Sequence, residues 1–254
     1  MVNNLFQKVE GIVLKSIDYG ESNKILTIFS REKGKFGAVA RGAKKPTSRL
    51  ASVSQPFTYA YFLCQIGSSL ATIQQGENID TFKTIKEDLF LTAYASYVVE
   101  LLDKGVDEKS ANPYLFELLY ETLRHFSEGY DPKIIKNIFE VKMLGVLGFR
   151  PVVTECVSCH DVDGPFVFSV SEGGILCSNC SVRDPHHLKV SPNTIKLLKL
   201  FFYIDIKRIG NINVKDITKK ELDQCIQSYY DAYSGIYLKT KKFLDSMESQ
   251  LGYN

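Results

Sequence analysis

The chain has 254 residues, of which 44% are hydrophobic and 24% are charged, a balance typical of an ordinary soluble protein. This length is more than one small domain usually needs, so we expect two or three domains. The formal net charge of +2 is too small to indicate a partner by itself, and it conceals an uneven distribution along the chain.

Other general features limit the compartment. The longest strongly apolar run, residues 89–99, is well short of the ~20 residues that span a bilayer, so no membrane contact is expected. Residues 1–8 lack the basic start and apolar run of a signal peptide. Four of the six cysteines form C-x-x-C pairs, and Cys64 and Cys225 stand alone in apolar surroundings, which suits a reducing compartment. We therefore expect a cytoplasmic protein.

The N-terminal region has the pattern of β structure. Residues 9–17 and 24–30 are rich in β-branched side chains and are separated by turn residues at 18–21. Residues 35–41 return after Gly34, and two more runs follow at residues 57–64 and 70–77. Five short strands in about 70 residues predict a small closed barrel of the OB type. We assign residues 1–80 to this OB-fold domain, with a loop at residues 42–54.

Positive charge gathers in one segment of this region, residues 31–49. Seven basic residues face the single acid Glu32 there, a local charge of +6, whereas residues 50–76 carry no charge. The seven are Arg31, Lys33, Lys35, Arg41, Lys44, Lys45 and Arg49. Such a run beside neutral strands is typical of an electrostatic nucleic-acid footprint. On charge alone, a solvated loop or an edge strand protected by lysines is an equal alternative.

From residue 81 onward the apolar residues recur at helical spacing. A helix is predicted over residues 89–105, and two more begin at the capping pairs Asn112-Pro113 and Asp131-Pro132. A fourth is predicted over residues 194–206, and a last one over residues 219–249 with an interruption at residues 234–235. The apolar stripes are most simply the core of a helical domain, residues 81–254, rather than a groove for a partner.

Two cysteine pairs interrupt the helical region. Cys156 and Cys159 form one C-x-x-C pair, and Cys177 and Cys180 form the second after seventeen intervening residues. This spacing predicts a four-thiolate zinc site in which each pair wraps one face of the metal. Turns at residues 163–164 and 173–174 and a short strand at 166–168 would bring the pairs together. We expect one structural zinc ion in a finger inserted at about residues 150–188.

The same cysteines allow other interpretations. A disulfide pair, ordinary buried cysteines and a c-type haem attachment before His160 compete with zinc, but haem would leave the second pair without a role. Nucleobase deaminases hold a catalytic zinc near a similar pair, with a glutamate in an H-x-E element. The sequence contains no H-x-E, and four thiolates leave no open position for water, so the structural interpretation is favoured.

Motifs for other kinds of catalysis are missing from the sequence. Residues 37–44 resemble a phosphate-binding loop, but Ala43 stands where its lysine is required. No dinucleotide-binding fingerprint, G-x-S-x-G elbow or H-E-x-x-H pair occurs. His186 and His187 are more simply a solvated turn, and Asp161 and Asp163 more simply cap backbone amides. We therefore expect no enzymatic activity.

Several motifs, taken in order, resemble one known family. In the N-terminal region they are residues 19–27 (Tyr-Gly-Glu-Ser-Asn-Lys-Ile-Leu-Thr), 32–35 (Glu-Lys-Gly-Lys), 40–49 (Ala-Arg-Gly-Ala-Lys-Lys-Pro-Thr-Ser-Arg) and 55–57 (Gln-Pro-Phe). Residues 145–151 (Gly-Val-Leu-Gly-Phe-Arg-Pro), the four-cysteine loop and residues 237–244 (Tyr-Leu-Lys-Thr-Lys-Lys-Phe-Leu) follow. This ordered set resembles the RecO family of bacterial DNA repair proteins over nearly the whole chain. One departure is Thr240, where the family pattern has Ser.

The resemblance implies a recombination mediator. Such a protein binds single- and double-stranded DNA, anneals complementary strands and helps to load the RecA recombinase onto DNA coated by the single-stranded DNA-binding protein SSB. RecR and the C-terminal tail of SSB are the implied partners, RecA is an indirect one, and a nucleoid-associated location follows. Some family members lack the metal cysteines, so the zinc prediction rests on the residues alone.

The predicted DNA contacts are the basic residues. Arg41, Lys44, Lys45 and Arg49 come first, Lys33 and Lys35 at the hairpin come second, and Lys239, Lys241 and Lys242 form a separate basic face. The aromatic residues Phe36, Phe57, Tyr59, Tyr61 and Phe62 offer stacking faces for bases, although about half should point into the barrel.

Two rival classes of protein share parts of this pattern. A zinc-ribbon factor of transcription or translation would combine four cysteines with basic residues, and it would bind specific sequences or the ribosome. A zinc hydrolase or deaminase would need an open metal position.

Overall fold

The described part of the chain comprises residues 6–67, 69–210 and 212–250 of a computed structural model. Residue contacts separate the chain into two units, Met1–Glu128 and Gly129–Asn254. Residues 1–5, which belong to the segment where no signal peptide is predicted, lie outside the described residues. Among the residues that are described, no helix is long and apolar enough to cross a membrane.

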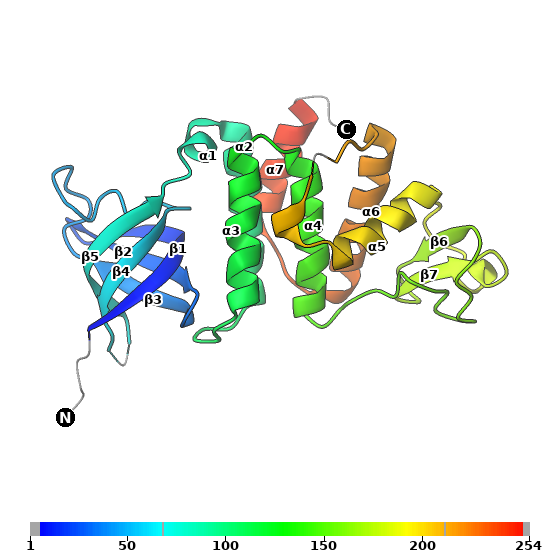
Figure 1. The fold of residues 1–254 in the computed structure, drawn as a ribbon, viewed down its shortest axis with the longest axis horizontal. Helices are drawn as coiled ribbons and strands as arrows, with labels where there is room; N and C mark the ends of the chain where they lie inside the picture. The colour runs from blue at the N-terminus through cyan, green and yellow to red at the C-terminus, as the bar shows by residue number, and fades with distance from the viewer. Residues whose placement is uncertain (1–5, 68, 211, 251–254) are drawn as a thin grey trace. The chain divides into compact units, whose positions relative to one another are not determined.

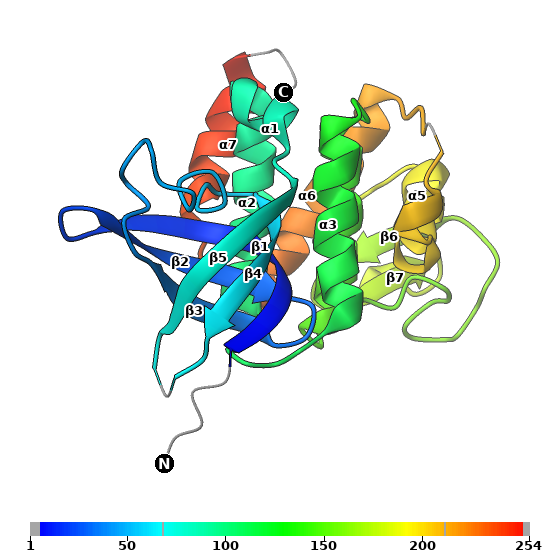
Figure 2. The same cartoon turned by 60° about the vertical axis from the view of Figure 1, so that its left-hand side comes forward.

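The first unit begins with five strands that close a barrel (Figures 1 and 2). They are β1 (Phe6–Tyr19), β2 (Asn23–Ser30), β3 (Gly34–Ala40), β4 (Tyr59–Gln65) and β5 (Ala71–Asp80). Their order around the barrel is β1-β2-β3-β5-β4, with β3 and β5 parallel and the other neighbours antiparallel. The predicted five-stranded barrel of the OB type is confirmed.

Alternating side chains fill the barrel interior. On β3 Gly34, Phe36, Ala38 and Ala40 are buried, and the residues between them are half-buried. On β2 Leu26 and Ile28 are fully buried and belong to the same core cluster. Because strand side chains alternate between faces, the residues at odd positions of β2 and β3 point outward.

The segment between β3 and β4, residues 41–58, is anchored in the barrel core. It forms a succession of turns, and Ala43, Leu50 and Val53 belong to the barrel's own cluster of buried residues. A Cβ added at Gly76 of β5 would lie only 2.7 Å from Val53 Cγ2, so Val53 packs directly on that strand. The predicted loop is therefore held against the barrel by side chains that are part of its core.

Three helices complete the first unit: α1 (Lys83–Glu87), α2 (Leu89–Gly105) and α3 (Pro113–Ser127). Asn112 Oδ1 accepts a hydrogen bond from the Leu115 amide at 3.0 Å, which confirms the predicted cap of α3. α2 ends at Gly105, as predicted.

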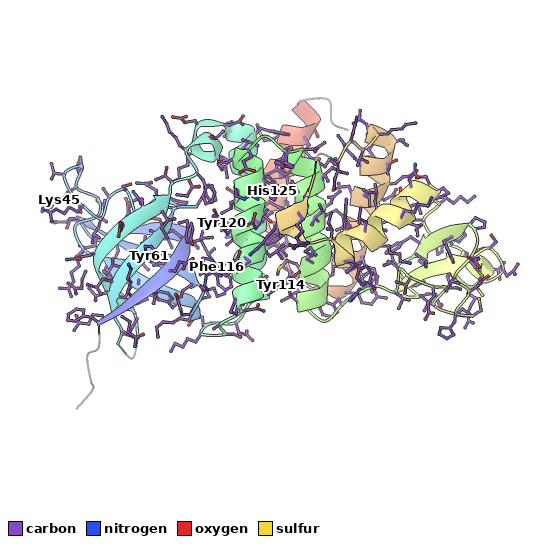
Figure 3. The ribbon with its side chains drawn as sticks, viewed as in Figure 1. Lys45, Tyr61, Tyr114, Phe116, Tyr120 and His125 are labelled. Atoms are coloured by element: carbon purple, nitrogen blue, oxygen red, sulfur yellow. The ribbon has the colours of Figure 1, made fainter. Side chains whose placement is uncertain are left out.

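Aromatic side chains of α3 join this helix to the barrel. The rings of Phe29 and Phe116 are 6.3 Å apart and those of Tyr59 and Tyr120 are 5.1 Å apart. Phe116 and Tyr120 point from α3 toward the strands (Figure 3). Residue contacts therefore group α1 to α3 with the barrel in one unit. The domain boundary at residue 80, which rests on the sequence, stays a prediction.

The second unit contains α4 (Pro132–Val146), α5 (Pro192–Tyr203), α6 (Asp216–Tyr233) and α7 (Lys239–Gln250), with the hairpin of β6 (Phe166–Ser169) and β7 (Gly174–Cys177) between α4 and α5. α4 packs against α5 and α6. Asp131 caps α4 as predicted, because its Oδ1 accepts from the Lys133 amide at 3.0 Å.

Two predicted helix limits in this unit are wrong. α5 ends at Tyr203 instead of residue 206, because Ile204 is extended with ψ of 135° and Ile206 starts a short 3-10 helix, Ile206–Arg208. α6 begins at Asp216, before the predicted start at residue 219. The predicted interruption of the last helix is confirmed, since α6 and α7 are separate elements.

Buried ion pairs hold the helices of the second unit together. Lys136 Nζ on α4 lies 2.6 Å from Asp223 Oδ1 on α6, and Lys133 Nζ lies 3.0 Å from Glu248 Oε2 on α7. Burial alone would raise the pKa of Asp223, but the attraction of Lys136 outweighs it, so this pKa is lowered. Breaking such a pair leaves one charge buried without compensation, so these lysines are structural.

Gly34 offers a direct test of the first unit's packing. Its φ is +67°, and an added Cβ would lie 2.2 Å from the backbone oxygen of Ser110 in the α2–α3 connection. We expect Gly34→Ala to lower the free energy of unfolding by about 2–4 kcal/mol, from backbone strain plus the clash. Gly20→Ala, at φ +59° in open space, should cost only about 1 kcal/mol. Urea denaturation would measure both, and equal losses would contradict this packing.

Candidate nucleic-acid interface and metal centre

The four cysteines of the two C-x-x-C pairs come together in the second unit. The Sγ atoms of Cys156, Cys159, Cys177 and Cys180 all lie within 4.8 Å of one another. A tetrahedral site with metal–sulfur bonds of about 2.3 Å separates its sulfurs by about 3.8 Å, so this cluster fits a metal ion. The predicted meeting of the two pairs is confirmed, and all six cysteines of the chain are free thiols.

Local backbone geometry brings the two pairs together. The His160 amide donates to the Cys156 carbonyl at 3.0 Å and the Cys180 amide donates to the Cys177 carbonyl at 3.0 Å, so each pair forms a tight turn. Cys177 is the last residue of β7, which pairs with β6. Gly173, with φ of +75°, lies in the turn as predicted, but Gly174 already belongs to β7.

Gly174 lets β7 approach the segment that leads into the first cysteine pair. A Cβ at this position would lie 2.2 Å from the Val152 carbonyl oxygen, and the Ile175 amide donates to that same oxygen at 2.9 Å. The Val157 amide donates to the Ile175 carbonyl at 2.9 Å. Backbone contacts therefore carry the first pair alongside the second.

The cluster favours a thiolate at Cys156. Burial raises the pKa of this thiol, but hydrogen bonds from backbone amides, including that of Cys177 at 3.4 Å, outweigh burial and lower the pKa to about 6. Thiolates are the form that binds metals. A set of four sulfur ligands closes a tetrahedral coordination sphere, which is typical of a structural site.

The basic loop of the first unit presents cations from a fixed backbone. The Gly42 amide donates to Asn23 Oδ1 at 2.9 Å, and the Lys44 amide donates to the Ser22 carbonyl at 3.0 Å, so the loop is tied to the β1–β2 turn. Arg41, Lys44, Lys45 and Arg49 are all exposed. Lys45 extends away from the strands (Figure 3).

These four cations are not equally available. Lys44 Nζ lies 3.2 Å from Asp18 Oδ2, so part of its charge is neutralised within the unit. Arg41, Lys45 and Arg49 have no ion pair among the residues that the structure describes. An anion approaching this loop therefore meets three uncompensated charges.

The two hairpin lysines lie differently. Lys35 Nζ is 3.3 Å from Asp103 Oδ1 and also donates to the Asp103 carbonyl, and its side chain is only 13% exposed. It fastens β3 to the end of α2. Lys33 lies half-buried in the β2–β3 turn, where its amide donates to Ser30 Oγ at 3.2 Å. Their predicted DNA contacts stay predictions, with less support than those of the loop.

The aromatic residues named from the sequence are mostly core. Phe36, Phe57, Tyr59 and Phe62 are buried: Phe36 and Phe62 belong to the barrel core, in keeping with the expected half, and Tyr59 packs against α3. Only Tyr61 is half-buried, and Lys8 Nζ lies 4.0 Å from the centre of its ring. The other four rings are buried in the barrel interior or in its contact with α3.

The third predicted basic group is on α7. Lys239 and Lys242 are exposed, while Lys241 Nζ lies 3.5 Å from Asp231 Oδ1. The DNA contacts of these residues stay predictions.

Sequence reasoning missed a second basic run in this unit. Residues 189–208 contain five basic residues against the single acid Asp205. Lys196 and Lys199 are exposed on one face of α5 with Tyr203, and the described residues provide no ion pair for either lysine. Arg150 Cζ lies 5.0 Å from the centre of the Tyr203 ring. A charge count along residues 189–208 would have found this surface.

Comparison with known proteins gives the family. A model described as "Recombination protein O N terminal" matches residues 4–82, and one described as "Recombination protein O C terminal" matches residues 86–242. The chain belongs to the RecO family. Curated RecO relatives include proteins named DNA repair protein RecO from Bacillus pumilus, 55% identical over 95% of this chain and 94% of the relative, and from Bacillus subtilis, 54% identical over 96% of each.

Removal of single cysteines tests the metal centre. We expect about one metal ion per chain, and Cys177→Ser should lower both metal content and the stability of the second unit, because a structural metal contributes folding free energy. Cys225→Ser is the matched control, since Cys225 is buried in the same unit but lies outside the cluster. Elemental analysis by mass spectrometry and thermal denaturation provide the readouts. Stable wild-type protein without metal would contradict the assignment.

Proposed function

We propose that this RecO family member acts in DNA repair and recombination by binding single- and double-stranded DNA and annealing complementary strands. The observation that carries the proposal is the loop of residues 41–49, which is anchored in an OB-type barrel. It exposes Arg41, Lys45 and Arg49, for which the described part of the chain provides no ion pair. The relatives' name, DNA repair protein RecO, supports the same role.

Counterion release drives binding at such a surface. Each lysine or arginine that neutralises a phosphate frees condensed cations from the nucleic acid, and this gain does not depend on base sequence. Two complementary strands repel each other through their phosphates. Cations held on the protein weaken that repulsion when both strands are bound, so the same residues serve binding and annealing.

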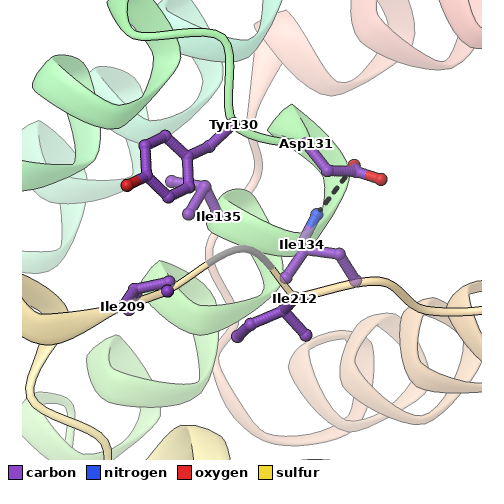
Figure 4. Close-up of a pocket in the computed structure, with 7 residues that line it drawn as sticks. Tyr130, Asp131, Ile134, Ile135, Ile209 and Ile212 are labelled. Carbon is purple, nitrogen blue, oxygen red and sulfur yellow. Dashed lines mark hydrogen bonds between the residues drawn. The ribbon is translucent and has the colours of Figure 1, made fainter.

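We further propose that the protein helps to load RecA onto SSB-coated DNA together with RecR, and that it contacts the C-terminal tail of SSB. A tail with acidic residues and an apolar end suits an apolar pocket close to basic residues. The second unit has a mainly apolar pocket between α4 and the segment after α5 (Figure 4). It is lined by Tyr130, Asp131, Ile134, Ile135, Ile209, Gly210 and Ile212, and the Asp131 carboxylate is paired with Lys219 Nζ at 2.5 Å. Lys207 and Arg208 directly precede it in the chain.

We propose zinc as the metal of the four-cysteine cluster, with a structural role. Zinc prefers four tetrahedral thiolates, and it would hold together a hairpin that has little core of its own. The described core cluster around the cysteines has three buried members, Cys156, Leu176 and Cys177. The proposed activity is binding and annealing, which requires no catalytic group.

Salt dependence tests the basic loop. The double variant Lys45→Ala/Arg49→Ala should weaken binding to all DNA sequences alike, and the slope of log affinity against log salt for single strands should shrink by about 1.4, or about 0.7 per lost contact. Stability should barely change, because exposed charges contribute little. Fluorescence anisotropy at several salt concentrations would measure the slope.

A matched control removes two lysines elsewhere in the same unit. Lys83→Ala/Lys104→Ala takes away the same charge from α1 and α2, where Lys83 is 78% exposed and paired with Glu87. This control should keep nearly the full slope. If the loop variant bound like the wild type, the loop would be only solvated and the proposal would fail.

A peptide of the SSB tail tests the apolar pocket. We expect it to bind the intact protein, and Ile212→Ser should weaken that binding at least severalfold, because the apolar end of the peptide loses its contact. Ile217→Ser is the control, since Ile217 is 62% exposed on α6 and does not line the pocket. Calorimetric titration at low salt provides the measurement. Equal effects of the two substitutions would count against this docking site.

A further inference from the structure

The end of the β1–β2 hairpin exposes apolar side chains beside the basic loop. Tyr19 is 54% exposed and Ile17 is 48% exposed. Because side chains two residues apart on a strand share a face, the two lie on the same side of β1. Neither was singled out by the sequence patterns as a stacking residue, and the rings that were singled out are mostly buried.

Strand register shows which face this is. Tyr19 is opposite Asn23, Ile17 is opposite Ile25, and Ile25 is opposite Val39 on β3. Leu26, Ile28, Ala38 and Ala40 alternate with these residues and are buried in the barrel core. The row that begins at Tyr19 and Ile17 therefore lies on the outer face of β1, β2 and β3.

Arg41 lies close to the end of this row. It follows Ala40, the last residue of β3, in a turn. The next residue, Gly42, donates its amide to Asn23 Oδ1 at 2.9 Å, and Asn23 is opposite Tyr19. Adjacent strands are about 4.8 Å apart, which separates the backbones of Tyr19 and Arg41 by about 10 Å. An exposed aromatic ring thus lies near a guanidinium that has no ion pair among the described residues.

The next row of this outer surface mixes polar and apolar residues, since exposed Lys15 is opposite Thr27, and Thr27 is opposite Gly37. Gly37 carries no side chain, and a Cβ there would lie 2.5 Å from Leu70 Cδ2, so Leu70 covers it. Leu70 is itself 43% exposed. Asp18 lies on the opposite face of the hairpin, where Lys44 is 3.2 Å and Lys24 is 3.9 Å away. Its carboxylate therefore does not face the surface formed by Tyr19, Ile17, Val39 and Leu70.

We infer that this outer surface binds the bases of single-stranded nucleic acid, with Tyr19 as the stacking ring, while Arg41 and the basic loop hold the phosphates. The inference rests on the proposed DNA binding and extends it. An exposed ring beside uncompensated cations fits a strand whose bases are unpaired, because every base has a face that can stack.

This arrangement distinguishes the substrate of annealing from its product. Phosphates of single strands and of duplex can both contact the loop, but bases inside a duplex are stacked on each other and cannot reach Tyr19. Annealing therefore removes one of the contacts that holds the DNA. The protein releases the duplex more readily than the strands from which it formed.

The test compares Tyr19→Ala, Tyr19→Phe and Tyr114→Ala. Tyr114 on α3 is 55% exposed in the same unit and serves as the matched control. Tyr19→Ala should weaken single-strand binding about fivefold or more, the loss of one base stack, and duplex binding less than twofold. Tyr19→Phe should retain both affinities. The salt slope should be unchanged in all three, because no phosphate contact is lost.

A second measurement uses the wild-type protein. Oligonucleotides that carry the fluorescent base 2-aminopurine should change emission on binding as single strands and not as duplex. Equal losses on both DNA forms, no loss, or no emission change would overturn the inference. The variant Lys45→Ala/Arg49→Ala tells failure of the inference from failure of the proposed function. If this variant loses DNA affinity and Tyr19→Ala does not, only the inferred stacking surface is wrong. If the double variant loses no affinity, the proposed DNA-binding loop itself is contradicted.

Discussion

Burial of Ala43, Leu50 and Val53 in the barrel core is the interaction on which the proposed DNA surface depends. These side chains fix a segment that the sequence alone would leave as a long loop. Its cations are therefore displayed from an ordered backbone, which lowers the conformational entropy lost when DNA binds. The hydrogen bond from the Gly42 amide to Asn23 extends this order to the β1–β2 hairpin, so the proposed phosphate contacts and the proposed base contacts lie next to each other.

Ion pairing separates cations with structural roles from those open to a ligand. Lys35 and Lys45 belong to the same basic run, yet Lys35 is held by Asp103 while Lys45 faces solvent. In the second unit Lys136 is buried against Asp223, whereas Lys196 is exposed on α5. Charge counts therefore locate a basic segment, and only the acid that lies next to each residue decides its role.

Sequence patterns predicted those features that depend on neighbours in the chain. Asn112 caps the first turn of the helix that follows it, α3, and the two C-x-x-C pairs come together in one cluster. The role of Lys35 was not predictable in this way, because Asp103 lies far along the chain. Tyr19 was missed for a related reason: its position beside the basic loop depends on the strand pairing with Asn23 and on the hydrogen bond from the Gly42 amide to Asn23.

Annealing of complementary DNA strands coated with SSB tests the central claim most directly. At low salt, the wild-type protein should accelerate duplex formation, measured by fluorescence transfer between labelled strands, and the acceleration should fall as salt rises. The variant that lacks Lys45 and Arg49 should lose most of this acceleration while keeping its fold. An annealing rate that the wild-type protein leaves unchanged, or that both proteins raise equally, would contradict the account.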